Sequence, residues 1–90
     1  MSVKLIRLFY FHRKEDYAMR EGVLVYDHES GRMDIRFDLL DYYGGLHCGE
    51  PLEVKIGDVW VPSTIELGDF WYLKGVYIAK LNGLHVRIKD

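Results

Sequence analysis

Residues 46–75, LHCGEPLEVKIGDVWVPSTIELGDFWYLKG, decide the fold that the rest of this 90-residue sequence must join. Two apolar-rich runs and a shorter aromatic run are separated by the same dipeptide, Gly57-Asp58 and then Gly68-Asp69. A two-residue hairpin loop needs a positive φ at its first central position or at both, and glycine adopts that conformation without steric cost. The stretch therefore predicts a three-stranded antiparallel meander with a two-residue turn at each Gly-Asp.

The first of these turns also predicts a register. With Gly57-Asp58 as the loop, Ile56 lies opposite Val59 and Lys55 lies opposite Trp60. Successive side chains of a strand point to opposite faces, so one face of this hairpin is apolar. That face carries Leu52, Val54, Ile56, Val59 and Val61.

The second turn does not determine which side chains of the following strand face the core. A two-residue loop there places Leu67 opposite Phe70. Pro62 cannot donate a ladder hydrogen bond, so it marks a sheet edge, a bulge or a strong bend. A bulge would reverse the alternation beyond it, so that either Trp71 or Tyr72 points inward.

A second hairpin is predicted over residues 22–37. Residues 23–26 are apolar, and residues 32–37 alternate between charged and apolar side chains, which is the pattern of a half-buried strand. Gly31 can take the left-handed position that closes the loop between the two arms. We expect Met33, Ile35 and Phe37 to face the core, and Arg32, Asp34 and Arg36 to face water.

The remaining segments are less regular. Residues 38–49 join the hairpin to the meander, and Asp38 is expected to cap one helical turn that Gly44 ends. Residues 84–89 alternate as a final half-buried strand. Residues 3–11 are partly apolar on both faces, which fits a strand and also a short helix.

These elements predict an all-β protein, a small SH3-like barrel of five to six antiparallel strands with an N-terminal strand or short helix. The alternative is an open antiparallel sheet packed on an N-terminal helix. Ninety residues have room for one domain, here 1–90, with an extension over 1–19 and the barrel over 20–89. The expected strands lie near 22–27, 32–37, 51–56, 59–67, 70–74 and 84–89.

Composition narrows the class and the compartment. A hydrophobic fraction of 49% and a charged fraction of 29% are typical of globular rather than disordered chains. The formal net charge of −2 argues against general nucleic-acid binding. Cys48 is the only cysteine, which excludes an intrachain disulfide and favours a cytoplasmic location. No apolar run approaches the roughly 18 residues of a membrane span, so no membrane association is expected.

The sequence does not predict a catalytic or metal-binding site. Cys48 lies beside His47, but neighbouring side chains of an extended chain point to opposite faces, so the two make a poor nucleophile and base. We therefore expect Cys48 to be a buried structural residue. No metal-site spacing and no phosphate-binding glycine loop is present, and we predict no catalytic residue, metal or cofactor. A small enzyme that uses Cys48 or a histidine–carboxylate pair is the alternative.

Aromatic residues give the strongest functional hypothesis, a module without enzymatic activity that binds a protein or peptide. Exposed rings beside the loops of small barrels form grooves for peptides, cations or bases, although tryptophans are also common in cores. Asp38 and Asp41 favour a basic peptide over nucleic acid, whose phosphates they repel, so a nucleic-acid-binding barrel is a further alternative. Residues 3–11 are a candidate homodimer contact. The predicted binding residues are Tyr42, Tyr43, Trp60, Trp71 and Tyr72.

The run Leu46-His47-Cys48-Gly49-Glu50, followed by Leu52-Glu53-Val54, Trp60, Ile65-Glu66 and Trp71-Tyr72-Leu73, resembles the signature of a family of short bacterial proteins. Its members carry a domain of unknown function and are often encoded with mobile elements. The resemblance covers about residues 20–89 and implies no activity, so it transfers no catalytic residue. More loosely, the order of turns and tryptophans is similar to that of SH3-like and Tudor-like barrels, which supports the fold.

Overall fold

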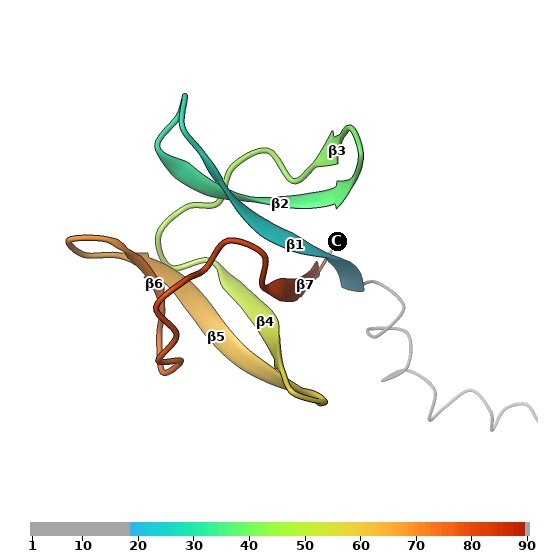
Figure 1. The fold of residues 1–90 in the computed structure, drawn as a ribbon, viewed down its shortest axis with the longest axis vertical. Coiled ribbons are helices and arrows are strands. Elements are labelled where there is room, and N and C mark those ends of the chain that lie inside the picture. Colours follow the sequence, from blue (N-terminus) through green and yellow to red (C-terminus); the bar gives the residue numbers. More distant parts are fainter. Residues whose placement is uncertain (1–18, 90) are drawn as a thin grey trace, which may run out of the picture.

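Seven antiparallel strands make up the part of the chain that the structure describes, residues 19–89 of a computed structural model (Figure 1). They form one sheet in the order β3-β2-β1-β7-β4-β5-β6, and residues 19–89 contain no helix. The predicted all-β class is confirmed. The strands are β1 (Met19–Asp27), β2 (Arg32–Asp38), β3 (Asp41–Tyr42), β4 (Pro51–Ile56), β5 (Val59–Leu67), β6 (Trp71–Leu73) and β7 (His85–Lys89).

The six predicted strands are all present, with ends within three residues of those expected. The seventh, β3, stands where we expected a helical turn after Asp38, and that prediction is wrong. Residues 39–40 form a turn, after which β3 returns along β2 with Asp41 opposite Asp38. The segment at 3–11, including its proposed homodimer contact, lies outside the described residues.

The first Gly-Asp turn forms as predicted. Gly57 has a φ of 62° and closes a two-residue loop in which Ile56 lies opposite Val59. Pro62 lies in a part of β5 that pairs only with β4, because β6 pairs with β5 only from Ile65 onward. The proline therefore marks a sheet edge, which is one of the three predicted options.

The second Gly-Asp turn differs from the prediction. Its loop contains three residues, 68–70, and Leu67 pairs with Trp71 rather than with Phe70. Gly68 has no positive φ, so the predicted two-residue turn is wrong. The additional loop residue turns Trp71 toward the core and leaves Tyr72 on the outer face.

Buried apolar side chains from six strands form the core, as the alternating patterns predict. Met33 and Ile35 are buried and Phe37 packs against them, which confirms the inward face of β2. The largest fully buried side chains are Leu24, Ile35, Leu46, Val54, Ile65, Leu73 and Val86.

Asp34 contradicts the prediction that the charged side chains of β2 face water, since it is only 9% exposed. Its Oδ1 atom accepts backbone N–H bonds from Ile35 at 2.8 Å, Gly44 at 3.0 Å and Gly45 at 2.9 Å. Burying a carboxylate is tolerated when several hydrogen bonds compensate its lost hydration. The side chain therefore holds the glycine pair against β2, which the alternation of the strand alone did not indicate.

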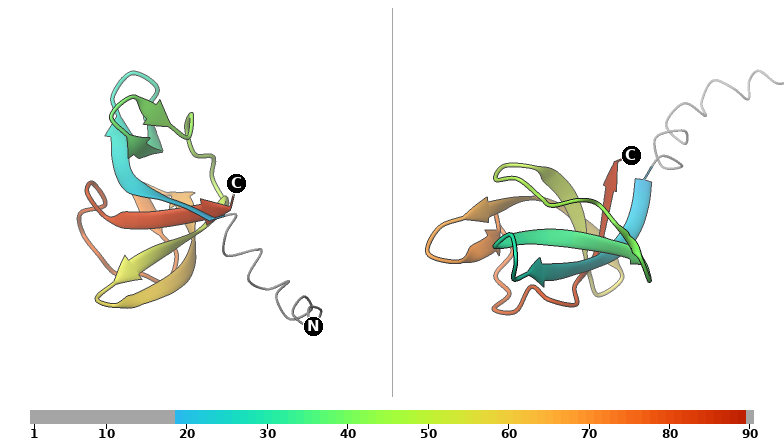
Figure 2. Two further views of the ribbon diagram at one scale, coloured as in Figure 1. Left: turned by 90° about the vertical axis from the view of Figure 1, so that its right-hand side faces the viewer. Right: turned by 90° about the horizontal axis from the view of Figure 1, so that it is seen from above.

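The sheet curls until strands far apart in its order meet, as the two views of Figure 2 show. Although β6 lies at one end of that order, the Nε1 of Trp71 donates a 2.9 Å hydrogen bond to the carbonyl of Gly31, between β1 and β2. Along the other side, Leu46 N–H donates to Met33 and Gly49 N–H donates to Ile65. The result is a small barrel-like domain with a hollow beside Trp71.

Candidate functional site

Tyr42 and Tyr43 lie together at one end of the sheet. Tyr42 is 48% exposed in β3, opposite Arg36 of β2. The hydroxyl of Tyr43 donates a hydrogen bond to Glu50, so this ring is tied to the loop that follows it. The carboxylate of Glu50 raises the pKa of Tyr43 because it favours the protonated phenol.

Trp60 lies apart from the tyrosines, on the outer face of β5. The guanidinium carbon of Arg87 is 4.5 Å from the centre of the ring, and the ammonium of Lys55 is 5.8 Å from it. Arg87 also binds Glu53, with two nitrogen–oxygen distances of 2.7 Å. These contacts cover the indole with side chains of the same sheet, and the neighbouring carboxylate offsets part of their positive charge.

Trp71 and Tyr72 point to opposite faces of β6. The 47% exposed Tyr72 lies on the outside, whereas Trp71 is half-buried and packs against the core. The five predicted binding residues therefore do not form one surface. Trp71 lines one hollow together with Tyr26 and Phe70, and Tyr42 lines another together with Tyr26.

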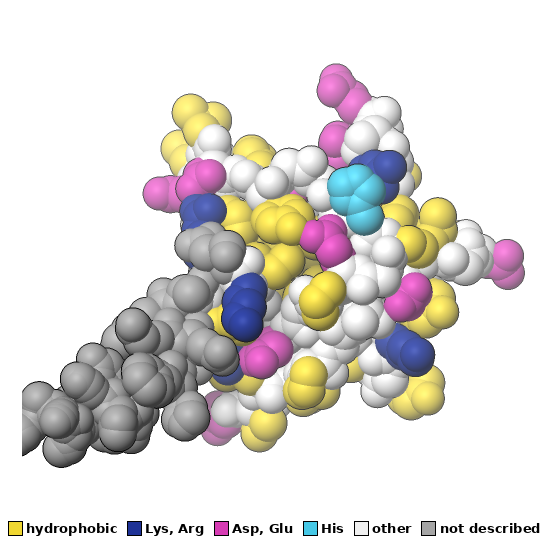
Figure 3. Space-filling view, turned by 180° about the vertical axis from the view of Figure 1, so that it is seen from behind, with side chains coloured by type: hydrophobic (Ala, Val, Ile, Leu, Met, Phe, Trp, Pro, Cys, Tyr) yellow, Lys and Arg dark blue, Asp and Glu magenta, His cyan; other side chains and the backbone are white. Residues whose placement is uncertain are grey.

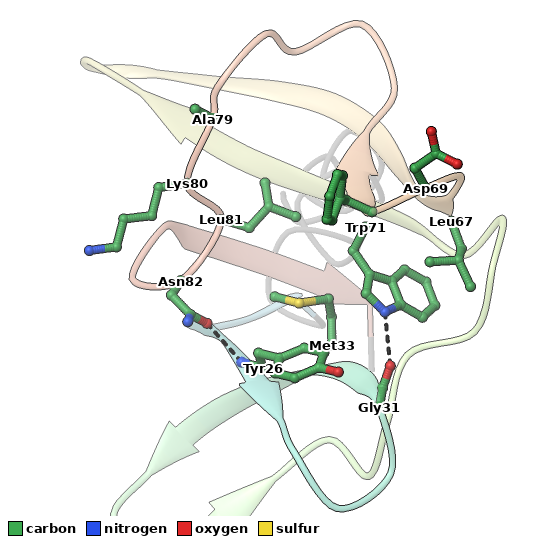
Figure 4. A pocket seen from close by; sticks show the side chains of 11 residues that line it. Tyr26, Gly31, Met33, Leu67, Asp69, Trp71, Ala79, Lys80, Leu81 and Asn82 are labelled. Carbon is green, nitrogen blue, oxygen red and sulfur yellow. Dashed lines mark hydrogen bonds between the residues drawn. The ribbon is translucent and has the colours of Figure 1, made fainter.

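That hollow, which we call the Trp71 groove, has a volume of about 530 Å³ and is shown in Figure 4. Three segments form its walls: the β1–β2 hairpin, the β5–β6 turn and the chain that leads into β7. The hydrogen bond from Trp71 to Gly31 joins two of these walls. The groove is lined by Tyr26, Gly31, Met33, Leu67, Asp69, Phe70, Trp71, Ala79, Lys80, Leu81 and Asn82.

Each wall of the groove is held in place by hydrogen bonds. Asn82 accepts the backbone N–H of Tyr26 through its Oδ1 at 2.7 Å, which fixes the segment before β7 against β1. In the β1–β2 loop, the Ser30 hydroxyl donates to Asp27 and lowers the pKa of that carboxyl. Hydrogen bonds from more than one segment therefore support the groove.

Large apolar side chains on the rim of the groove remain in contact with water. Phe70 is 82% exposed and Leu67 is 51% exposed. Exposure alone does not identify a site, because the face drawn in Figure 3 carries several separate groups of apolar side chains among charged ones. The Trp71 groove combines exposed apolar side chains with a concave shape, which is the usual form of a recognition site.

The Leu-His-Cys-Gly-Glu run is a structural turn beside β5. Leu46 is fully buried, and Glu50 accepts the backbone N–H of His47 at 2.7 Å. Gly49 has a φ of 88° and donates its N–H to Ile65. These contacts give Leu46, Gly49 and Glu50 structural roles in the loop.

Cys48 is exposed, so the prediction that it is buried is wrong. Its Sγ accepts the N–H of Leu67 at 3.2 Å. Glu50 lies near His47, with 3.7 Å between the carboxylate Oε1 and Nδ1. No group of three or more metal-ligating side chains occurs within residues 19–89.

Of the eleven residues that line the Trp71 groove, sequence reasoning named only Trp71 as a binding residue, and those it missed include Tyr26, Phe70 and Leu81. Phe70 gave the one usable signal. A turn places its side chains at the surface, and a large apolar ring exposed there can mark a contact with a partner. Tyr26 and Leu81 looked like ordinary strand or loop residues. Tyr26 is 56 residues from Asn82, and Leu81 is 11 residues from Phe70. Only the curl of the sheet brings these residues to one groove.

Residues 22–88 match the DUF5348 family, which is described as a domain of unknown function. The chain is also similar to a protein from Ruminococcus gnavus whose crystal structure was determined by a structural genomics consortium. The two are 62% identical with a TM-score of 0.74, and the match covers 77% of this chain and 100% of that one. No curated protein matches the sequence. Among residues 19–89 there is no helix that could cross a membrane.

Proposed function

Because the chain belongs to the DUF5348 family, whose domain has no assigned function, we propose from its geometry that it is an interaction module without enzymatic activity. The module binds an extended peptide segment of a partner protein in the Trp71 groove. The association of this family with mobile elements and the cytoplasmic location remain predictions from the sequence.

The observation that carries this proposal is the exposed ring of Phe70 on the rim of a concave aromatic surface. An 82% exposed phenylalanine contributes nothing to the core, and burying it against a partner removes apolar area from water. Trp71 and Tyr26 supply large rings with few rotatable bonds, which lose little entropy on binding. Grooves of this kind suit extended segments whose side chains enter shallow pockets.

The alternative of a small enzyme has less support. An activated thiol needs a base within hydrogen-bond reach, and the described contact of the Cys48 sulfur is with a backbone N–H. Rapid and selective alkylation of Cys48 at neutral pH would indicate a thiolate and would favour an enzyme instead.

The test is a pair of matched substitutions, Phe70→Asp in the groove and Leu40→Asp in the β2–β3 turn. Both residues are apolar and at least 82% exposed, so neither change is expected to move the melting temperature by more than about 3 °C. We expect bacterial cell extract passed over the immobilised wild-type chain to yield proteins that Leu40→Asp retains and Phe70→Asp loses. Equal capture by the wild type and Phe70→Asp would contradict a role for the groove.

A further inference from the structure

We propose that the Trp71 groove reads the direction of its peptide by charge, with an acidic ligand residue beside Lys80 and a basic one beside Asp69. This inference rests on the proposed function and names the chemistry of the partner. The ligand is an extended peptide with an apolar centre and opposite charges on its two sides.

The first support is the placement of the two charges. Asp69 and Lys80 lie at opposite ends of the groove, one beyond Trp71 and the other on the segment that leads into β7 (Figure 4). Neither makes an ion pair with any residue in the described range 19–89. Each charge therefore remains available to a ligand without first breaking a contact within the fold.

The second support is the character of the surface between the two charges. Its floor is formed by Met33, Trp71 and Leu81, of which Met33 and Leu81 are only 3% and 9% exposed, and the indole N–H of Trp71 is already satisfied by Gly31. The Oδ1 of Asn82 is likewise occupied by the backbone of Tyr26. A ligand therefore meets a mainly apolar middle, where shape and burial supply affinity, and separated charges at the ends, which supply orientation.

The size of the expected effect follows from the exposure of the two groups. Asp69 and Lys80 are both exposed, and such ion pairs are weak, so each should alter affinity by about two- to fivefold. Direction is set by the sum of both pairs, because a reversed peptide would lose two attractions and gain two repulsions.

The experiment selects peptides from a random twelve-residue library displayed on phage, using the full chain as target. We expect the selected peptides to share an apolar centre with an acidic residue on one side and a basic residue on the other. One such peptide is then made in two forms, the second with its two charges exchanged. Both are titrated by fluorescence anisotropy against the wild type, Asp69→Lys, Lys80→Glu and the double variant.

The proposal expects each single reversal to weaken the original peptide, and the double variant to prefer the charge-exchanged form. Asp58→Lys is the matched control, since Asp58 is the exposed aspartate of the other Gly-Asp dipeptide and does not line the groove, and it should leave both affinities unchanged. If Asp58→Lys lost as much affinity as Asp69→Lys, the effect would be one of net charge alone, and the inference would be overturned.

Two outcomes separate this inference from the function on which it rests. Peptides that are apolar throughout and bind all charge variants equally overturn the charge readout but retain the groove. Peptides whose binding survives Phe70→Asp, or a dimer of the chain that Phe70→Asp dissociates in sedimentation velocity, overturn the peptide groove itself.

Discussion

The two Gly-Asp turns have the same dipeptide and different structures. At Gly57-Asp58, a positive φ closes a two-residue loop between two strands whose ends extend into water, with Val59 60% exposed. At Gly68-Asp69, the loop takes a third residue and the glycine has no positive φ. The first turn is governed by local backbone preference, and the second by what the following strand must bury.

The burial that decides the second turn is visible in β6. With a two-residue loop, Tyr72 would face the core beside Ile65, and its hydroxyl would need a buried partner. The three-residue loop instead pairs Ile65 with Leu73, which is 1% exposed, and directs Trp71 to Gly31. Tertiary contacts therefore outweighed the preference of the dipeptide.

The largest expected effect tests whether burial in β6 anchors the second turn. Leu73→Ala should lower the free energy of unfolding by about 2–5 kcal/mol, because it removes a fully buried side chain and leaves a cavity. Val59→Ala, beside the first turn, should cost no more than about 0.5 kcal/mol because that side chain is exposed. Urea denaturation of both variants provides the measurement, and similar losses would remove the distinction between the turns.

An intermediate effect is expected at the glycines themselves. Gly57→Ala places a Cβ at a φ of 62° and should cost about 1 kcal/mol. Gly68→Ala should stay within about 0.5 kcal/mol of the wild type, since its Cβ would meet the Tyr72 ring at an ordinary 3.6 Å. Equal destabilisation in thermal or urea unfolding would mean that both turns share the left-handed conformation.

The smallest expected effect concerns the loop that packs beside the second turn. The hydrogen bond to Glu50 raises the pKa of Tyr43 above its usual value of 10.0, so the folded chain holds this proton more tightly than the unfolded chain. The associated stability is complete below about pH 10 and is lost as the pH rises through the raised pKa. Tyr43→Phe should therefore be less stable than the wild type at pH 7, by less than about 1 kcal/mol.

The sign of this pH dependence gives its own control. The difference between Tyr43→Phe and the wild type should narrow in urea titrations above pH 10. Tyr42→Phe is the matched control at pH 7, because it removes a hydroxyl that makes no hydrogen bond within residues 19–89, and it should leave the free energy of unfolding unchanged. A Tyr43→Phe difference that is constant from pH 7 to about pH 11 would rule out the coupling to Glu50.

The sequence alone determined six of the seven strands and the first turn, because alternation and a Gly-Asp pair flanked by β-branched residues act over a few neighbours. It also identified Trp71 as a candidate binding residue, and it predicted the register between Ile56 and Val59. These features depend on side-chain period and backbone sterics, which every segment carries with it.

Only the tertiary structure decided the length of the second loop, the burial of Asp34 and the assembly of the Trp71 groove. Asp34 is buried because Gly44 and Gly45, ten and eleven residues later, donate their N–H groups to it. Tyr26 meets Asn82 across 56 positions because the sheet curls. Alternation determines which face of a strand a side chain occupies. What covers that face depends on segments that are distant in the chain, and the alternation of one strand contains no information about them.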